Sequence, residues 1–294
     1  MGYIPARAFC GANPTYRPGY ADILSISASD EFPIVESRSG FIFSGWNPPD
    51  EFLAKVYDDV IDHSKTITET VDYRRGLLEL AAAFLRIVEQ SHPSSTKTRR
   101  LLDFGCGYGS LTRMLHGRDI KCCGYDPSAA RLSRASQAGV EVSDNLESVA
   151  EFGPFDLLIC TEVLEHVANP REVLRYLNKN ASPGALLAIT VPQCEPSFMT
   201  DYFAALAREG TLSRLVNPWE HLNYFSASSL RGLLAEEGFT PVHDHGRTAF
   251  LRETCLQMGD SKRRESRVRA GLRIARTLTA TSRSTQLICR TDQS

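Results

Sequence analysis

The chain has 294 residues, of which 42% are hydrophobic and 23% charged, and its formal net charge at pH 7 is −2. This composition predicts a soluble globular protein with a substantial core, long enough for one large domain and an additional lobe. The longest apolar stretch, residues 77–88, has the spacing of an amphipathic helix and is too short to cross a bilayer, which excludes a membrane-spanning protein.

The first 96 residues differ in character from the remainder. Residues 1–46 are rich in Pro, Gly, Ser and aromatic side chains and contain short strand-like runs at 22–27 and 41–44. From residue 47 to 96 the pattern becomes helical, with one helix opened by Pro48-Pro49-Asp50 and a longer one over about 70–90. We therefore expect a small β lobe followed by a helical cap, with residues 92–95 as the linker.

An apolar strand then leads into a glycine-rich turn at residues 101–109, Leu-Leu-Asp-Phe-Gly-Cys-Gly-Tyr-Gly. Glycines lack a Cβ, so the backbone of this turn can approach a nucleotide-like ligand closely, although a tight turn without a ligand is the alternative. Ser110 is the expected cap of the next helix. A second strand, 120–125, stops at Asp126, about 20 residues beyond the glycines, where an acidic side chain takes ribose hydroxyls.

Further strands and helices alternate along the remainder of the chain, which predicts a parallel sheet covered by helices on both faces. Ser226 is the expected cap of the last of these helices. The expected elements are a helix from 127 to 139, strands at 140–143, 155–160 and 185–191, a helix over 226–237, and strands near 240–245 and 286–290, the last one antiparallel.

Four segments together resemble the successive motifs of class I S-adenosylmethionine (SAM)-dependent methyltransferases: residues 101–109, 124–126, 155–160 and 162–167. The resemblance covers roughly residues 98–250. A dinucleotide dehydrogenase is the alternative, but its glycine pattern requires glycine where this chain has Ser110. The resemblance implies an α/β Rossmann-like fold with a seven-stranded, mostly parallel sheet whose last strand is antiparallel.

The resemblance also divides the chain. Residues 1–46 correspond to a degenerate zinc-ribbon-like β lobe, 47–96 to a helical N-terminal cap, and 97–294 to the SAM-binding domain. Two insertions are expected in that domain, a cap at 193–217 and a basic helical segment at 252–284.

The cofactor that the resemblance implies is SAM, with S-adenosylhomocysteine as its product. Around the glycine-rich turn, Asp103 would order the loop, and Gly105, Cys106, Gly107 and Gly109 would line the methionine portion. The remaining implied contacts are Asp126 and Pro127 at the ribose, Asp144 and Asn145 at the adenine, and Thr161 and Glu162 beside the methionine end. For Asp126 a helix N-cap is a compatible alternative, and for Cys106 a small buried apolar residue is preferred.

Many methyltransferases of this type begin with a zinc-binding lobe held by two Cys-x-x-Cys pairs. Here Cys10 and Asn13 stand at the first pair, and Glu36 and Ser39 stand at the second. Only one of four ligands remains, so we expect no zinc and no dedicated metal site. The eight cysteines are scattered without a disulfide framework and no signal peptide precedes them, which favours the cytoplasm.

Methyl transfer is an in-line displacement that depends mainly on positioning, but an oxygen acceptor must also lose a proton. The candidate catalytic residues are His166, after the fourth strand, and His221 with the adjacent Glu220. A structural hydrogen bond for His166 and a helix-initiating segment for His221 are the alternatives. Residues 198–206 and the N-terminal helices with Tyr57 and Tyr73 are candidate walls of the acceptor pocket.

The expected function is methylation of a small molecule at oxygen, on a sugar or a specialised metabolite, as in ubiquinone-type O-methyltransferases. Sugar C-methylation and a non-catalytic SAM-binding protein are the alternatives. Nucleic acid is an unlikely partner, because Thr161-Glu162-Val163-Leu164 replaces the motif of base N-methylation. The segment 261–294 carries nine Lys/Arg and two acidic residues, as expected of a solvated helix face or of a phosphate-contacting surface. The sequence indicates no oligomeric state.

Overall fold

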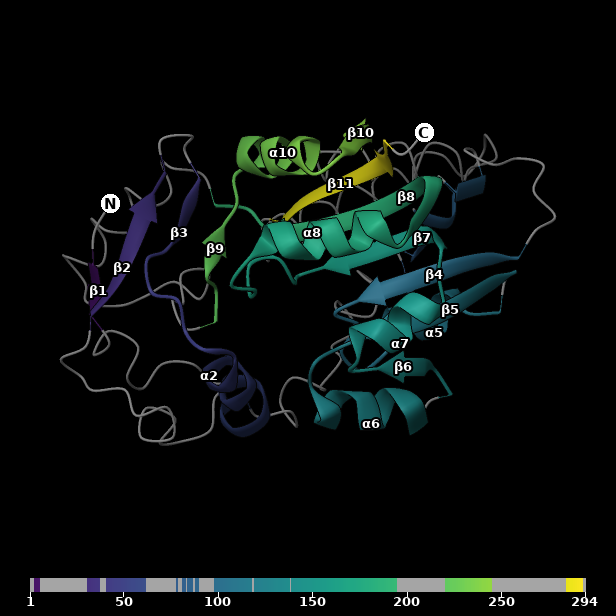
Figure 1. The fold of residues 1–294 in the computed structure, drawn as a ribbon, viewed down its shortest axis with the longest axis horizontal. Helices are drawn as coiled ribbons and strands as arrows, with labels where there is room; N and C mark the ends of the chain where they lie inside the picture. Colours follow the sequence, from purple (N-terminus) through teal and green to yellow (C-terminus); the bar gives the residue numbers. More distant parts are fainter. Residues whose placement is uncertain are drawn as a thin grey trace, which may run out of the picture.

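The computed structural model contains two sheets, one small and antiparallel and the other seven-stranded. They lie side by side, with the small sheet at the N-terminal end of the molecule (Figure 1). The structure describes residues 3–5, 31–37, 41–61, 78, 81–82, 84–86, 88–89, 98–117, 119–137, 139–194, 220–244 and 284–292. Several features predicted from the sequence lie outside these residues. They are Cys10, Asn13 and Ser39 of the expected zinc-ligand pairs, the strand-like run 22–27, Tyr73, the linker 92–95 and nearly all of both insertions.

The small sheet has the order β1-β2-β3-β9. Its first three strands are β1 (Tyr3–Pro5), β2 (Glu31–Glu36) and β3 (Ile42–Ser44), and each pairs antiparallel with the next. The fourth strand, β9 (Asn223–Tyr224), comes from the far end of the chain and pairs with Ile42 and Phe43. Glu36, a candidate position of the second zinc pair, is exposed in β2.

A helical segment follows the small sheet. Pro49 precedes α2 (Asp50–Lys55), which continues directly into the π-helical turn η2 (Val56–Val60). Val56 and Val60 are fully buried, so the turn is anchored in the core. The described positions of the next expected helix are helical, and Ala81, Phe84 and Val88 are buried, as its amphipathic spacing requires.

The large sheet has the order β10-β11-β8-β7-β4-β5-β6. β11 pairs antiparallel with both of its neighbours, and the other pairings are parallel, which confirms the expected fold class. The strands are β4 (Arg99–Phe104), β5 (Ile120–Tyr125), β6 (Glu141–Ser143), β7 (Phe155–Thr161), β8 (Ala181–Pro192), β10 (Phe239–Asp244) and β11 (Ser284–Thr291), and the helices are α5 (Ser110–Leu115), α6 (Ala129–Gln137), α7 (Leu146–Glu151), α8 (Pro170–Lys179) and α10 (Ala227–Glu236).

Side chains alternate along each strand of the large sheet, so its central strands contribute to two apolar clusters, one on either face. Leu102 and Leu158 belong to the apolar cluster under α8 and α10. Their neighbours Leu101 and Leu157 point to the opposite face and pack with Phe84 and with residues of α5. Consecutive apolar residues therefore run through the middle of the central strands, as is usual in buried parallel strands.

Several helix boundaries differ from those predicted by the sequence. α5 begins at Ser110 itself after Gly109, which adopts φ +69°, so Ser110 does not cap the helix. α6 begins at Ala129 rather than at Pro127, because the Ser128 N–H donates to the Asp126 carboxylate and holds the preceding residues in a turn. The cap at Ser226 is confirmed, and Ser226 and Ser229 form a reciprocal capping box.

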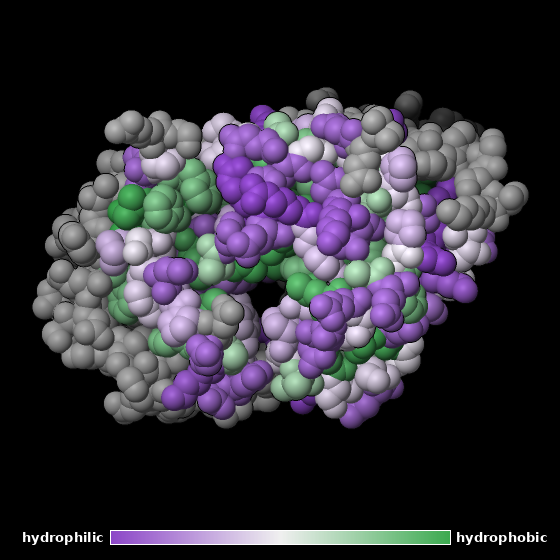
Figure 2. Space-filling view, in the orientation of Figure 1, coloured by the Kyte–Doolittle hydropathy of each residue, from purple (hydrophilic) through white to green (hydrophobic). Residues whose placement is uncertain are grey.

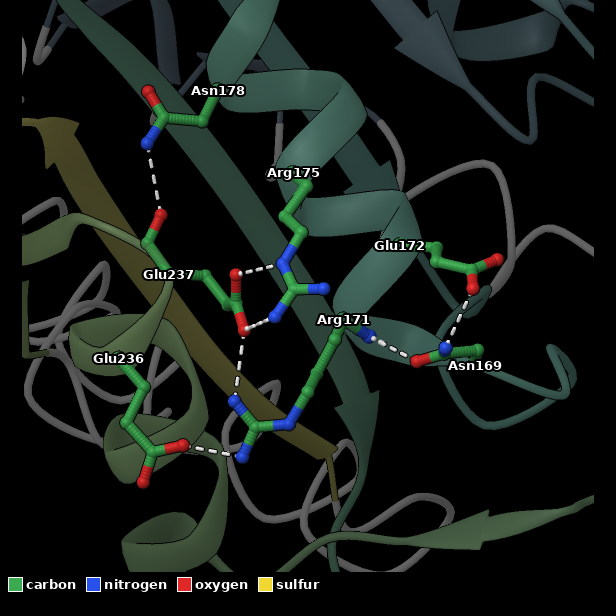
Figure 3. Close-up of polar contacts among 7 residues, drawn as sticks. All are labelled: Asn169, Arg171, Glu172, Arg175, Asn178, Glu236 and Glu237. Atoms are coloured by element: carbon green, nitrogen blue, oxygen red, sulfur yellow. Dashed lines mark hydrogen bonds and ion pairs between the residues drawn. The ribbon is translucent and has the colours of Figure 1, made fainter.

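An ion-pair network ties α8 to the end of α10, with Glu237 at its centre (Figure 3). Glu237 accepts hydrogen bonds from Arg171 Nη1 and Arg175 Nε, each at 2.8 Å. Arg171 also pairs with Glu236, and Asn178 Nδ2 donates to the Glu237 carbonyl at 2.9 Å. Burial acts to raise the pKa of Glu237, but the two arginines outweigh it and lower that pKa. This network fixes the helix pair on the sheet.

Candidate active site

The carboxyl ends of β4, β5 and β7 meet at one edge of the large sheet, facing β9 and α2 (Figure 1). In the space-filling view the molecule is hollowed between this edge and the N-terminal elements (Figure 2). Open α/β sheets bind ligands at this edge. The described candidates for cofactor binding and catalysis lie at the ends of these three strands or in the loops after them, except Asp144 and Asn145, which follow β6, and Glu220 and His221, which precede β9.

The glycine-rich turn adopts backbone conformations that favour glycine at two positions. Gly105 and Gly107 have φ of +77° and +55°, which favour glycine. A Cβ on Gly105 would lie 2.3 Å from Val163 Cγ2, whereas a Cβ on Gly107 would meet nothing within 4 Å. The N–H groups of Gly105 and Cys106 donate to the Tyr125 carbonyl, which fixes the turn to the end of β5. Gly105 thus permits close packing, and Gly107 borders open space that suits a ligand.

Asp103 lies beneath this turn and is 2% exposed. Its carboxylate accepts a hydrogen bond of 2.5 Å from the Thr112 hydroxyl at the start of α5. Burial raises the pKa of Asp103 to about 6, and the hydrogen bond from Thr112 opposes this shift. The structure therefore supports an ordering role for Asp103 in the turn.

Asp126 connects the turn to α6. One carboxylate oxygen accepts the Gly107 N–H at 2.9 Å and the other accepts the Ser128 N–H at 3.0 Å. The side chain is buried, and Pro127, which follows it, is exposed. Asp126 thus orders the turn before α6 and does not cap the helix, because Ser128, whose hydroxyl accepts the Arg131 N–H at 3.4 Å, precedes its first residue.

The remaining candidate cofactor contacts have varied environments. Cys106 is buried, with a pKa raised by burial, as expected of a small apolar residue. Asp144 is exposed, and Asn145 caps α7 by accepting the Ser148 N–H at 2.9 Å. Thr161 ends β7. Glu162 adopts φ +53°, and its carboxylate accepts a hydrogen bond of 3.0 Å from the Thr190 hydroxyl.

The two candidate bases lie in contact, with ring centroids of His166 and His221 4.8 Å apart. His166 Nδ1 is 2.8 Å from the Glu220 carbonyl oxygen, so Nδ1 carries the proton and Nε2 is the basic nitrogen. Burial, and then the neighbouring His221, lower the pKa of His166 to about 4. His166 is therefore a neutral imidazole at physiological pH. Glu220 contributes its backbone to this geometry.

Glu165 is a site residue that the sequence analysis did not single out. It is 2% exposed, and neither carboxylate oxygen has a hydrogen-bond partner in the described part of the chain. Its Oε1 is 3.6 Å from His166 Nε2. Burial, followed by the charge of Glu162, raises the pKa of Glu165 well above its ordinary value. Its place directly before His166 was the only sequence signal.

Glu165, His166 and His221 also form a set of groups that could hold a divalent cation, since their ligand atoms lie within 4.8 Å of one another. Two imidazoles and a carboxylate are ligands that zinc accepts. The sequence analysis had expected no dedicated metal site.

Asn223 fixes the loop that carries these residues. Its side-chain amide donates to the carbonyls of Leu164 and Val167, at 2.9 and 2.7 Å. The backbone N–H groups of Leu222 and Asn223 both donate to the Glu165 carbonyl. β9 is thereby bound to the loop after β7, and at the same time it is paired with β3.

Tyr57, one of the candidate walls, lies beside the base. Its ring centroid is 6.0 Å from that of His166, and the guanidinium carbon of Arg131 lies 4.7 Å from the Tyr57 ring centroid on its other side. The neighbouring Asp58 accepts a hydrogen bond of 3.0 Å from the Ser128 hydroxyl. η2 therefore contacts both the start of α6 and the candidate base His166.

This fold and this edge-of-sheet site define a class I SAM-dependent methyltransferase domain. Residues 72–244 match the family model described as "Methyltransferase domain", and the chain belongs to that family. In the described residues, no helix is long and apolar enough to cross a membrane.

The chain is similar to curated ubiquinone biosynthesis O-methyltransferases. It is 31% identical over 160 residues to that of Caulobacter sp. (strain K31), covering 50% of this chain and 60% of the relative, and 33% identical over 127 residues to that of Hahella chejuensis, covering 40% and 52%. The chain thus spans only about three fifths of these relatives' length. Among solved structures, the plantazolicin methyltransferase BpumL shares the fold at 12% identity, with a TM-score of 0.54, covering 82% of this chain and 94% of that one.

Proposed function

We propose that this chain transfers a methyl group from SAM to an oxygen atom of a small-molecule acceptor, a sugar or a specialised metabolite. The observation that carries this proposal is the placement of a neutral, oriented imidazole, His166, on the loop that packs against Gly105 of the glycine-rich turn. The donor-binding and proton-accepting groups thus share one edge of the sheet.

The residues present suit SAM. The open space at Gly107 accommodates a ligand against the backbone, and Asp126 stands at the end of β5 to accept ribose hydroxyls. We assign the methionine portion to Asp103, Gly105, Cys106, Gly107, Gly109, Thr161 and Glu162, the ribose to Asp126 and Pro127, and the adenine to Asp144 and Asn145. SAM supplies an electrophilic methyl group on its sulfonium.

The chain's own residues would activate the acceptor. Because Nδ1 of His166 is committed to the Glu220 carbonyl, its Nε2 is oriented to accept the proton of an acceptor hydroxyl. Tyr57 and His221 flank the imidazole and would exclude water from it. The contact between two histidines offers a second proton acceptor, which favours sugar C-methylation as the second candidate function, since a carbon acceptor must also lose its proton.

Formation of S-adenosylhomocysteine from SAM, with a panel of sugar and phenolic acceptors, tests the proposal. Product NMR would assign the methyl group to oxygen or to carbon. His166→Gln should lower turnover by about 100-fold or more while S-adenosylhomocysteine binding is retained. His116→Gln changes an exposed histidine at the end of α5 and is the matched control. Cofactor binding without turnover on any acceptor would instead support the non-catalytic alternative.

The cytoplasm remains our proposed location. The six cysteines in the described part of the chain are buried and form no disulfide, as in proteins of reducing compartments.

A further inference from the structure

At this edge of the sheet, in the part of the chain that the structure describes, the guanidinium of Arg131 has a buried N–H donor without a hydrogen-bond acceptor. Arg131 lies in the first turn of α6, and its side chain is 22% exposed. Its Nε is buried and has no hydrogen-bond partner among the described residues. Its Nη1 is 3.8 Å from Asp126 Oδ2, which is beyond hydrogen-bonding distance. The guanidinium is a planar group with five donors, and the described residues leave its Nε–H without an acceptor.

Asp126 forms an ion pair with Nη1 but provides no acceptor for Nε. Both of its oxygens already accept backbone N–H groups, from Gly107 and Ser128. In the proposed function the same carboxylate also faces the ribose of the cofactor. A buried donor without a partner costs free energy, so its retention indicates a ligand that supplies the missing acceptor.

The position of Arg131 indicates which ligand this is. The Tyr57 ring is in contact with both the guanidinium, at 4.7 Å, and the His166 ring, at 6.0 Å. Burial raises the pKa of Tyr57 and lowers that of His166, and the positive charge of Arg131 opposes the first shift and adds to the second. Arg131 is therefore one side chain away from the candidate base and also lies beside Asp126, at the ribose end of the proposed cofactor site.

We propose that Arg131 binds an anionic group of the methyl acceptor, a carboxylate or a phosphate, through its Nε and one Nη atom. The planar guanidinium matches the oxygens of both groups and can bind them by two parallel hydrogen bonds. Stacking on Tyr57 already fixes the plane of the guanidinium, so little side-chain entropy would be lost on binding. This inference rests on the proposed function, because it assigns a charge to the acceptor of that reaction.

Calorimetric titration of the full chain, saturated with S-adenosylhomocysteine, tests the proposal. The probes are inorganic phosphate, acetate and the neutral analogue acetamide, at constant ionic strength. We expect phosphate or acetate to bind at up to about 50 mM, and acetamide not to bind. The anion that binds more tightly identifies the class of acceptor group. Arg131→Gln should weaken anion binding by about tenfold or more, and Arg131→Lys should weaken it less.

Arg134→Gln is the matched control, because Arg134 is an exposed arginine of the same helix that also lies over a tyrosine ring, that of Tyr108. It should leave anion binding unchanged. S-Adenosylhomocysteine binding to each variant reports whether its pocket is folded, and we expect its affinity to stay within about threefold of the original. Two results would overturn the inference: no anion binding to the unmodified chain, or a loss of S-adenosylhomocysteine affinity in Arg131→Gln as large as the loss of anion affinity. A chain that does not bind S-adenosylhomocysteine at all would contradict the proposed function itself.

Discussion

At the scale of single residues, the candidate site combines ionisable groups whose charges burial has suppressed. His166 is neutral because its pKa is lowered to about 4, and the pKa of Glu165 is raised well above the ordinary range. Neither group needs to change its protonation state before an acceptor binds. The neutral His166 is ready to receive a proton near neutral pH, although a base of such low pKa accepts it with a small driving force.

These pKa values predict a pH profile with two separate acid limbs. His166 is basic only when unprotonated, so kcat at saturating SAM should stay level on acidification and fall as the pH approaches about 4, rather than near the usual 6.5. Asp103 is charged only above about pH 6, so the KM for SAM should rise as the pH falls below that value. Steady-state kinetics across pH would separate the two. A kcat that falls near pH 6.5 would contradict the assignment of His166 as the base.

At the scale of elements, two polar clamps hold the parts that carry the site. The Glu237 clamp fixes α8 to the end of α10 and includes no candidate catalytic group (Figure 3). The Asn223 clamp fixes the loop of Glu165 and His166 to β9. The first should therefore affect stability, and the second should affect catalysis.

Glu237→Gln should destabilise the fold by about 1 to 2 kcal/mol, because it leaves two arginines without their common carboxylate. The folded-state pKa of Glu237 is depressed, so its contribution to stability is present above its unfolded pKa of 4.5 and is lost as the pH falls through the lower folded value. Thermal unfolding across acid pH measures both effects. Glu236→Gln, at a 60% exposed side chain that pairs with Arg171 alone, should cost less than about 0.5 kcal/mol. Equal losses in the two variants would disprove the central role of Glu237.

Asn223→Ala should lower kcat by about tenfold or more and leave S-adenosylhomocysteine affinity almost unchanged, because it frees the loop of the base but not the glycine-rich turn. Asn178→Ala removes a similar side-chain bond to a carbonyl, that of Glu237, and is the control. Kinetics and calorimetry on both variants provide the comparison. If cofactor affinity fell in parallel with kcat, Asn223 would be supporting the whole fold rather than positioning the base.

Sequence patterns predicted well those elements that are recognisable from a short run of consecutive residues. β4, β5 and β7 each contain consecutive buried apolar residues, and β5 occupies the predicted range. β9 could not be predicted, because two residues carry no periodicity and their partner in β3 lies about 180 positions away. Glu165 and Arg131 were missed for a related reason. Only the packed structure shows that their polar atoms are buried without partners.

At the scale of the whole molecule, the small sheet and the large sheet are connected through β9. Besides the pairing of β9 with β3, the Ser44 N–H donates to the Leu222 carbonyl at 2.8 Å, and the rings of Phe41 and Phe225 lie 5.3 Å apart. The boundaries 1–46, 47–96 and 97–294 remain our proposed division of the chain. In the described residues, these parts are nevertheless joined by the β3–β9 pairing and by aromatic contacts.

Removal of residues 1–46 should therefore lower turnover by about tenfold or more, since β9 would lose its partner and the loop of His166 its outer support. Removal of residues 1–5 takes away only β1, which pairs with β2 and not with β9, and should have little effect. Turnover and thermal unfolding of both truncated chains provide the measurement. Full activity without residues 1–46 would show that β9 holds the loop unaided.

The shared strand also imposes a thermodynamic reciprocity. If the pairing of β3 with β9 helps to order the loop of the base, then a ligand that orders this loop must stabilise that pairing by the same free energy. Occupancy of the acceptor pocket would then slow amide hydrogen exchange at Ser44, in the small sheet, as well as on the loop itself. An N-terminal lobe that has lost most of the expected zinc ligands would thus remain energetically coupled to the reaction centre.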